Sequence, residues 1–169
     1  EAFKATNDLL GKGNLIYRST EPFLDEGRSF GAGSVIISAN PALGNELVNK
    51  YALDIMNLGE LPEDFIIMQK QKIAVYGDEG VYHALRQMEF QFDELSVSDI
   101  EDGKIANYDI FINLDARWSR LSNAGKNSMR IFFESGGNYI GFGYRGRGIQ
   151  FAIDAEIIDA DYYYEDGNA

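Results

Sequence analysis

The sequence predicts an α/β protein in which a mainly parallel sheet lies between two layers of helices, preceded by a small α-β-β-α segment. From about residue 70 onward, apolar runs of strand length alternate with amphipathic runs of helix length, and this alternation is typical of βαβ units. With 169 residues, the chain can bury roughly 70% of the surface that its unfolded form exposes. A packed core of this kind is therefore expected.

The first 62 residues predict the α-β-β-α segment. Apolar side chains repeat on one helical face over residues 3–10, and Gly11-Lys12-Gly13 is expected to end that helix. Residues 15–18 and 34–38 predict two strands, and the polar stretch 19–33 between them predicts a loop. Asn40-Pro41 suits the start of a second helix, whose apolar stripe continues until Gly59. Residues 61–64 then predict a connector.

The remainder, residues 70–169, predicts the main α/β domain. Its expected helices are residues 81–89 and 122–135, and its expected strands are residues 72–77, 94–97, 108–114 and 138–142. The strand at 94–97 is the weakest of the four. Because the chain begins at Glu1 without Met and ends in mid-pattern, we expect a piece of a longer protein whose main domain is cut short at its C-terminal end.

Composition excludes several classes of function. The net charge is −12, from 27 acidic and 15 basic residues, and this charge repels nucleic acid and anionic membranes. The chain has no cysteine, and His83 is its single histidine. A catalytic zinc takes two or three imidazoles in most enzymes, so we expect no metal site and no cofactor in this chain alone.

The turn after the strand at 138–142 has the position of a nucleophile elbow but lacks a nucleophile. Gly141-Phe142-Gly143-Tyr144-Arg145-Gly146 follows the strand, whereas such an elbow carries Cys or Ser. We therefore predict no catalytic residues, a degenerate elbow formed by Gly141, Gly143, Tyr144 and Arg145, and a strained or left-handed backbone at Gly143. The same glycines spell G-x-G-x-x-G, which alternatively predicts a dinucleotide site, or simply close packing of strand and helix.

The loops that follow the strands predict a binding rim. In open α/β sheets, ligands bind beyond the carboxyl ends of the strands. The candidate rim residues are Asp78, Glu79, Asp115, Arg117, Trp118, Tyr144, Arg145 and Arg147. Such a mixture suits a small zwitterion, an anionic ligand or a peptide carboxylate, and the alternative is a set of solvated loop charges.

Three other groups have weaker functional interpretations. His83 could act as an acid or base with Asp78 or Glu79, but the lack of a nucleophile partner favours a surface or half-buried helix residue. Asp25-Glu26 and Glu101-Asp102 could form carboxylate pairs. Neighbouring acids point apart on most backbones, so both pairs are expected in solvated loops.

Several runs resemble the class I glutamine amidotransferase-like fold, a flavodoxin-like arrangement. These are Lys72-Ile73-Ala74-Val75-Tyr76-Gly77, Asn107-Tyr108-Asp109-Ile110-Phe111-Ile112-Asn113 and Phe132-Phe133-Glu134-Ser135-Gly136-Gly137-Asn138-Tyr139-Ile140-Gly141. The resemblance covers about residues 70 to 160. Within this fold, the chain most resembles the amidotransferase-like domain that follows the catalytic domain in bacterial zinc carboxypeptidases of the carboxypeptidase A type. In those enzymes, a stretch resembling residues 2–38 also precedes the amidotransferase-like domain.

This resemblance implies a non-catalytic accessory domain for substrate presentation or domain packing. Its partner would be the catalytic domain of its own parent chain, any zinc would belong to that domain, and the compartment would be extracellular or periplasmic. The chain departs from the family in having Gly143 where amidotransferases have Cys, and it has neither a later His-x-Glu pair nor the His-x-x-Glu of a carboxypeptidase. A binding module that uses the rim, and a hydrolase with an unrecognised site, are the alternatives.

Overall fold

The computed structural model describes residues 1–38, 40–142 and 147–158. These residues divide into two compact units. Unit 1 contains residues 1–70 and 83–91, and unit 2 contains residues 71–82 and 92–169. The chain therefore passes from one unit to the other at three places. No helix in the described ranges is long and apolar enough to cross a membrane.

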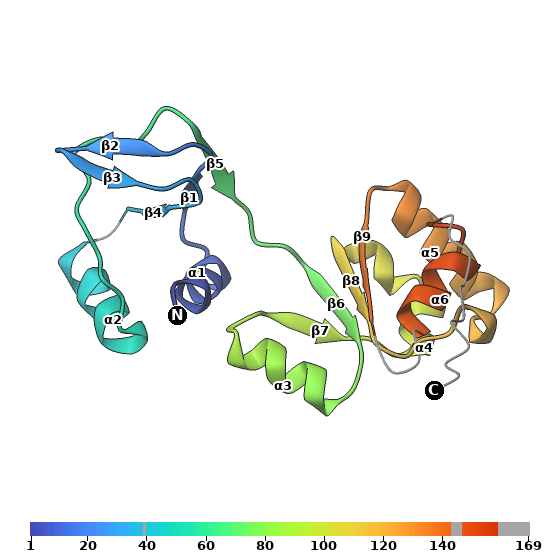
Figure 1. The fold of residues 1–169 in the computed structure, drawn as a ribbon. Coiled ribbons are helices and arrows are strands. Elements are labelled where there is room, and N and C mark those ends of the chain that lie inside the picture. The colour runs from blue at the N-terminus through green and yellow to red at the C-terminus, as the bar shows by residue number, and fades with distance from the viewer. Residues whose placement is uncertain (39, 143–146, 159–169) are drawn as a thin grey trace, which may run out of the picture. The chain divides into compact units, whose positions relative to one another are not determined.

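Unit 1 is built from two helices, a three-stranded antiparallel sheet and a separate hairpin (Figure 1). In chain order its elements are α1 (Ala2–Gly11), β1 (Ile16–Ser19), β2 (Phe23–Asp25), β3 (Arg28–Phe30), β4 (Val35–Ile37), α2 (Pro41–Tyr51) and β5 (Phe65–Met68). The sheet has the order β4-β1-β5, and β2 pairs only with β3. Its core consists of Ala5 and Leu9 from α1, Ile16 from β1, and Leu47 and Tyr51 from α2.

The α-β-β-α prediction for this segment is incomplete. The stretch predicted as a polar loop contains the β2–β3 hairpin, whose turn residues Glu26 and Gly27 have φ values of 47° and 79°. Positive φ at both central residues is the geometry of a tight two-residue hairpin turn. The second helix begins as predicted, with the Asn40 side chain accepting a hydrogen bond from the Leu43 N–H. It ends at Tyr51 rather than Gly59, because Ala52 adopts the left-handed conformation.

Unit 2 contains a four-stranded parallel sheet in the order β7-β6-β8-β9 (Figure 1). Its strands are β6 (Ile73–Tyr76), β7 (Phe92–Glu94), β8 (Ile110–Asn113) and β9 (Asn138–Gly141). The helices are α4 (Val97–Glu101), α5 (Asn123–Glu134) and α6 (Arg147–Asp154), with two 3-10 turns, η1 (Lys104–Asn107) and η2 (Trp118–Arg120). Helix α3 (Glu79–Gln87) joins β6 to β7. The prediction of an α/β protein with a parallel sheet is confirmed.

One face of this sheet packs against α4, α5 and α6. Ala74 and Phe111 from the strands join Ile100, Met129 and Phe151 from the helices in one buried cluster. On the opposite face, Ile73, Val75 and Ile112 are also buried, whereas Ile140 of β9 is 47% exposed. Burial of that face therefore ends before the last strand.

The weak strand predicted at 94–97 is displaced. Strand β7 ends at Glu94, and Ser96 caps α4. The Ser96 hydroxyl accepts from the Asp99 N–H while the Asp99 carboxylate accepts from the Ser96 N–H. This reciprocal capping box satisfies two backbone donors at once, so it favours a helix where the short apolar run alone indicates a strand.

Candidate functional site

The carboxyl ends of β6, β8 and β9 lie side by side at one edge of the parallel sheet. Tyr76 is in register with Asn113, and Asn113 with Gly141. The Leu114 N–H donates to the Tyr76 carbonyl (2.8 Å), and the Phe142 N–H donates to the Asn113 carbonyl (3.1 Å). The segments that follow the three strands therefore start from the same edge, as the sequence predicts.

A network of hydrogen bonds formed by the side chains of Asn113 and Tyr139 connects the segments at this edge. Asn113 is fully buried, and its Oδ1 accepts from the Ala116 N–H (2.7 Å) while its Nδ2 donates to the Ala116 carbonyl (3.2 Å). The same Nδ2 donates to the Tyr139 hydroxyl (2.9 Å), which in turn donates to the Gly148 carbonyl (2.8 Å). The network thus ties the loop after β8 to the first turn of α6.

Burial raises the pKa of Tyr139 well above the usual value for a phenol, and the hydrogen bond from Asn113 offsets only part of this increase. Tyr139 therefore remains neutral near pH 7 and keeps the proton that it donates to Gly148. Sequence reasoning missed both members of the network. The feature that could have indicated it is an Asn at the end of an otherwise apolar buried strand.

Two glycines allow β9 and α6 to approach closely. A Cβ on Gly148 would lie 2.3 Å from the Phe142 nitrogen, and one on Gly141 would lie 2.8 Å from the Gly148 carbonyl oxygen. No side chain fits at either position. This supports the packing interpretation for Gly141 within the G-x-G-x-x-G run. Gly143, Tyr144, Arg145 and Gly146 lie outside the described residues, and so does the expected backbone strain at Gly143.

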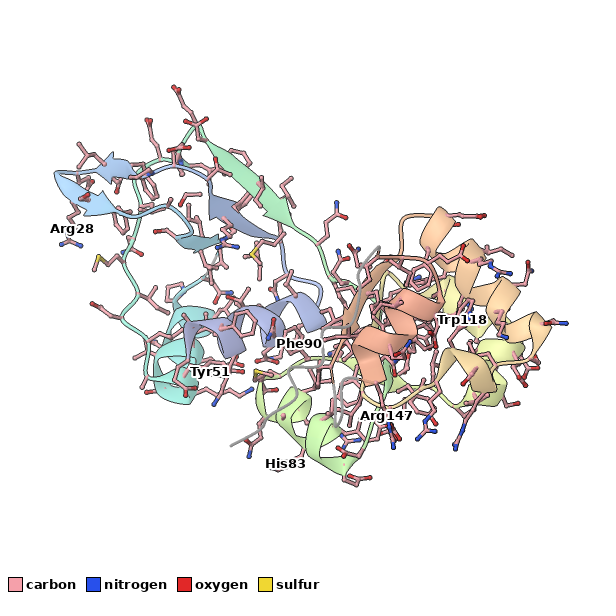
Figure 2. The ribbon with its side chains drawn as sticks, turned by 45° about the vertical axis from the view of Figure 1, so that its right-hand side comes forward. Arg28, Tyr51, His83, Phe90, Trp118 and Arg147 are labelled. Carbon is pink, nitrogen blue, oxygen red and sulfur yellow. The ribbon has the colours of Figure 1, made fainter. Side chains whose placement is uncertain are left out.

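Two of the charged rim residues that the structure describes, Asp115 and Asp78, contact groups close to them. Asp115 forms an ion pair with Arg147. Arg147 is the first residue of α6 (Figure 2). Asp78 accepts from the N–H groups of Gly80 (3.0 Å) and Val81 (3.1 Å) and so caps the start of α3. Glu79 is the first residue of α3, and the half-buried Arg117 directly precedes η2.

Trp118 departs from the expectation of a rim residue. Its side chain is only 7% exposed and packs edge-on against Phe151, with ring centroids 5.5 Å apart. The Arg130 guanidinium lies over the indole at 5.6 Å. Trp118 therefore contributes to the core of unit 2 (Figure 2), because a large aromatic side chain buries more apolar area there than in a loop.

Among the other candidates, His83 and the Asp25-Glu26 pair belong to unit 1, and Glu101 is the last residue of α4 in unit 2. His83 is exposed on α3 (Figure 2). One acid of each neighbouring pair makes a structural contact: the Asp25 carboxylate accepts from the Gly59 N–H (3.2 Å), and the Glu101 carboxylate accepts from the Ser122 N–H (2.9 Å). The latter bond lowers the pKa of Glu101. It also joins α4 to the start of α5. The expectation of solvated loops is wrong for these two acids, because Asp25 ends β2 and Glu101 ends α4.

In the described part of the chain, no three His, Asp or Glu side chains gather in a way that could hold a metal ion. A cavity of about 550 Å³ is lined entirely by residues of unit 1 and includes none of the predicted rim residues. Of the predicted rim residues that the structure describes, Asp115 and Arg147 are brought together as an ion pair, whereas Asp78 caps α3 and Arg117 precedes η2.

Comparison with known proteins finds no matching family model, no matching curated protein and no matching solved structure. The class of this protein follows from its structure alone. It is a mixed α/β protein with a four-stranded parallel sheet and polar residues at the carboxyl ends of the strands. The resemblance to amidotransferase-like domains rests on the sequence runs quoted above.

Proposed function

We propose that this chain is a non-catalytic, amidotransferase-like accessory domain of a zinc carboxypeptidase, with unit 2 as the amidotransferase-like part. The observation that carries the proposal is the strand order. Numbered along the chain, β7-β6-β8-β9 is 2-1-3-4, which is the order of flavodoxin-like sheets apart from a fifth strand. The burial of Ile73, Val75 and Ile112 on the face opposite α5 is consistent with helices on both faces.

The absence of a nucleophile from the elbow sequence supports the non-catalytic role. Phe142, Gly143 and Tyr144 stand where a Cys or Ser would be needed, and none of them can attack a carbonyl. At the same edge, the Asn113 side chain bonds the backbone of Ala116 in the loop after β8, and the Tyr139 hydroxyl donates to the Gly148 carbonyl in α6. What this edge offers a parent enzyme is therefore a rigid surface that can present a substrate or pack against the catalytic domain.

The test begins with the reading frame upstream of Glu1, which we expect to encode His-x-x-Glu and a distant second His. The full-length protein would then be compared with a version that lacks residues 1–169, using C-terminal hydrolysis of a peptide as the assay. For a presentation role we expect KM to rise in the shortened enzyme, with a smaller change in kcat. A frame without the zinc-binding motif would contradict the proposal.

The hydrolase alternative needs its own control. The isolated chain would be assayed against glutamine, p-nitrophenyl acetate and dipeptides, alongside a His83→Ala variant. We expect no turnover above the buffer rate. Turnover that His83→Ala abolishes would instead favour a hydrolase with an unrecognised site.

A second candidate function is a carboxylate-binding module at the rim. The observation that favours it is that the strand order reverses between β6 and β8, and ligands of open α/β sheets bind at such switch points. The Asp78 and Asp115 loops flank this point. Arg147 is already paired with Asp115, and a solvent-accessible pair of this kind contributes only about 0–1 kcal/mol, so a ligand carboxylate could replace Asp115 at little cost.

Thermal-shift titration with N-acetylated dipeptides tests this module. Arg117→Ala and Arg147→Ala should each weaken binding about tenfold or more, because a charged hydrogen bond contributes about 1.5–3 kcal/mol. Arg120→Ala, an exposed substitution in the same 3-10 turn as Trp118, is the matched control. Equal affinity in all three variants, or no shift at millimolar dipeptide, would exclude the rim as the binding site.

A further inference from the structure

Unit 1 contains a groove that the proposed function does not use. It lies between the β2–β3 hairpin and the 59–64 loop, and its volume is about 550 Å³. Its lining, which we call the acidic groove, consists of Glu21, Pro22, Phe23, Leu24, Asp25, Glu26, Gly59, Glu60, Leu61, Pro62, Glu63 and Asp64. All of these residues belong to unit 1.

Two sets of hydrogen bonds, one involving a side chain and one between backbones, join the two walls of the acidic groove. At one end, both carboxylate oxygens of Asp25 lie 3.2 Å from the Gly59 nitrogen and accept its hydrogen. At the other end, the Thr20 N–H donates to the Asp64 carbonyl (3.0 Å). Stacking of Phe23 on Phe30, with ring centroids 4.9 Å apart, stiffens the hairpin wall. The groove is therefore formed by tied segments.

The charged residues that line the acidic groove are all negative. Six of its twelve residues are Asp or Glu, five are apolar, and none is Lys, Arg or His. Within the described residues, none of the six carboxylates forms an ion pair with a cation. Arg28 lies opposite Asp25 in the hairpin register, but these two side chains form no ion pair either. Leu24 is 76% exposed and Leu61 is 43% exposed. The groove thus offers uncompensated negative charge beside accessible apolar surface.

We propose that the acidic groove binds a basic peptide segment in which Arg or Lys alternates with apolar residues. Complementary charge steers such a segment to the groove and selects its sign. Exposed ion pairs contribute little individually, so contacts with Leu24 and Leu61 supply the remaining affinity. A metal ion fits this groove less well, because no metal-holding group of three acids occurs in the described part of the chain.

The probe is a fluorescein-labelled, end-capped octapeptide of four Arg-Leu repeats, measured by fluorescence anisotropy with the full chain. Two matched peptides, four Glu-Leu repeats and four Arg-Gly repeats, separate the sign of charge from the apolar contribution. We expect the Arg-Leu peptide to bind most tightly, the Arg-Gly peptide more weakly and the Glu-Leu peptide not at all. Raising NaCl from about 0.05 M to about 0.5 M should weaken binding, because the Debye length falls from more than 10 Å to a few Å.

Variants locate the site. The double variant Glu60→Gln/Glu63→Gln should weaken Arg-Leu binding about fivefold to tenfold, as expected for the loss of two exposed charge pairs. Leu24→Ser should weaken the Arg-Leu peptide more than the Arg-Gly peptide. The control is Asp102→Asn/Glu134→Gln, which removes the same charge from exposed positions in unit 2, and circular dichroism confirms that each variant is folded.

Three results would overturn the proposal. The first is no binding of the Arg-Leu peptide at low salt, and the second is equal weakening by the groove and control variants, which indicates non-specific attraction to a chain of charge −12. The third is displacement of the peptide by micromolar Ca²⁺ or Mg²⁺, which indicates a cation site. Because the readout is peptide binding to unit 1, it is independent of peptidase activity and of the rim.

Discussion

Gly148 sets the distance between helix α6 and strand β9. A Cβ at this position would lie 2.3 Å from the Phe142 nitrogen and 2.6 Å from the Gly141 carbonyl carbon. Both are backbone atoms that cannot rotate away. We therefore expect Gly148→Ala to lower the free energy of unfolding of unit 2 by about 1–3 kcal/mol, the usual cost of overpacking, as measured by urea denaturation followed through Trp118 fluorescence.

The control for this prediction is Gly44→Ala in α2. Its Cβ would meet no atom within 4 Å, and alanine favours a helix interior over glycine by about 0.5–1 kcal/mol. We expect a small increase in the stability of unit 1, measured by circular dichroism. Equal effects of the two substitutions would indicate that close packing at Gly148 does not limit stability.

Tyr139 carries the hydrogen bond that connects β9 to α6. Tyr139→Phe removes the hydroxyl of a half-buried side chain that bonds both Asn113 and Gly148, and the carbonyl of the buried Gly148 loses this donor. We expect a decrease of about 1–3 kcal/mol in the free energy of unfolding. Tyr108→Phe, which removes a solvent-accessible bond to Asp93, should cost less than about 0.5 kcal/mol. A larger effect at Tyr108 than at Tyr139 would contradict this account.

Helices α1 and α2 are joined by the carboxylate of Asp8, which is 13% exposed. It bonds the Tyr51 hydroxyl (2.9 Å) and forms ion pairs with Lys12 and Lys50, both at 3.1 Å. Burial acts to raise the pKa of Asp8, but the hydrogen bonds from Lys12, Tyr51 and Lys50 outweigh it, so the pKa lies below the usual 3.8.

A lowered carboxylate pKa gives stability that is present above the pKa of the unfolded state and is lost as the pH falls through that of the folded state. Unit 1 should therefore become less stable below about pH 4. Asp8→Asn should be less stable than the wild type at pH 6 and should lose less on acidification to pH 3. Urea denaturation followed by circular dichroism at both pH values measures this. An equal loss in both proteins would contradict it.

At the scale of the whole molecule, residues 83–91 belong to unit 1 although both of their flanking segments belong to unit 2. Phe90 packs edge-on against Phe3 at 5.5 Å, and the Met88 carbonyl accepts from the Asn7 side chain (2.8 Å). A fragment of residues 71–169 loses these contacts. We expect this fragment to unfold at a lower urea concentration than the full chain, as measured by the midpoint of the change in Trp118 fluorescence. An unchanged midpoint would show that the α/β part folds independently of residues 1–70.

The sequence identified the buried parallel strands and the long amphipathic helix of the main domain. Ile73–Tyr76, Ile110–Asn113 and Asn123–Glu134 all lie within the predicted ranges, because buried parallel strands appear as continuous apolar runs. It missed β5, whose Phe65–Met68 run lacks alternation and is half exposed. It also missed the β2–β3 hairpin, because three-residue strands carry too little pattern to distinguish them from a polar loop.

The candidate site shows the same division. The sequence predicted that the loops after β6, β8 and β9 start at one edge, since parallel strands end on the same side of a sheet, and the register confirms it. It could not predict that Trp118 would be buried, or that Asn113 and Tyr139 would connect the edge to α6. Those outcomes depend on side-chain packing between segments distant in sequence.

The sequence by itself determined the α/β class of the main domain, the absence of cysteine, the single histidine, and the lack of Cys or Ser in residues 141–146, because residue identity and local periodicity suffice for each. Only the tertiary structure decided which charges have partners and which do not. The pairing of Asp115 with Arg147 arises from segments that the fold brings together. So does the gathering in one groove of six acids that form no ion pair with any residue the structure describes. Electrostatic energy depends on those distances in space rather than on separation along the chain.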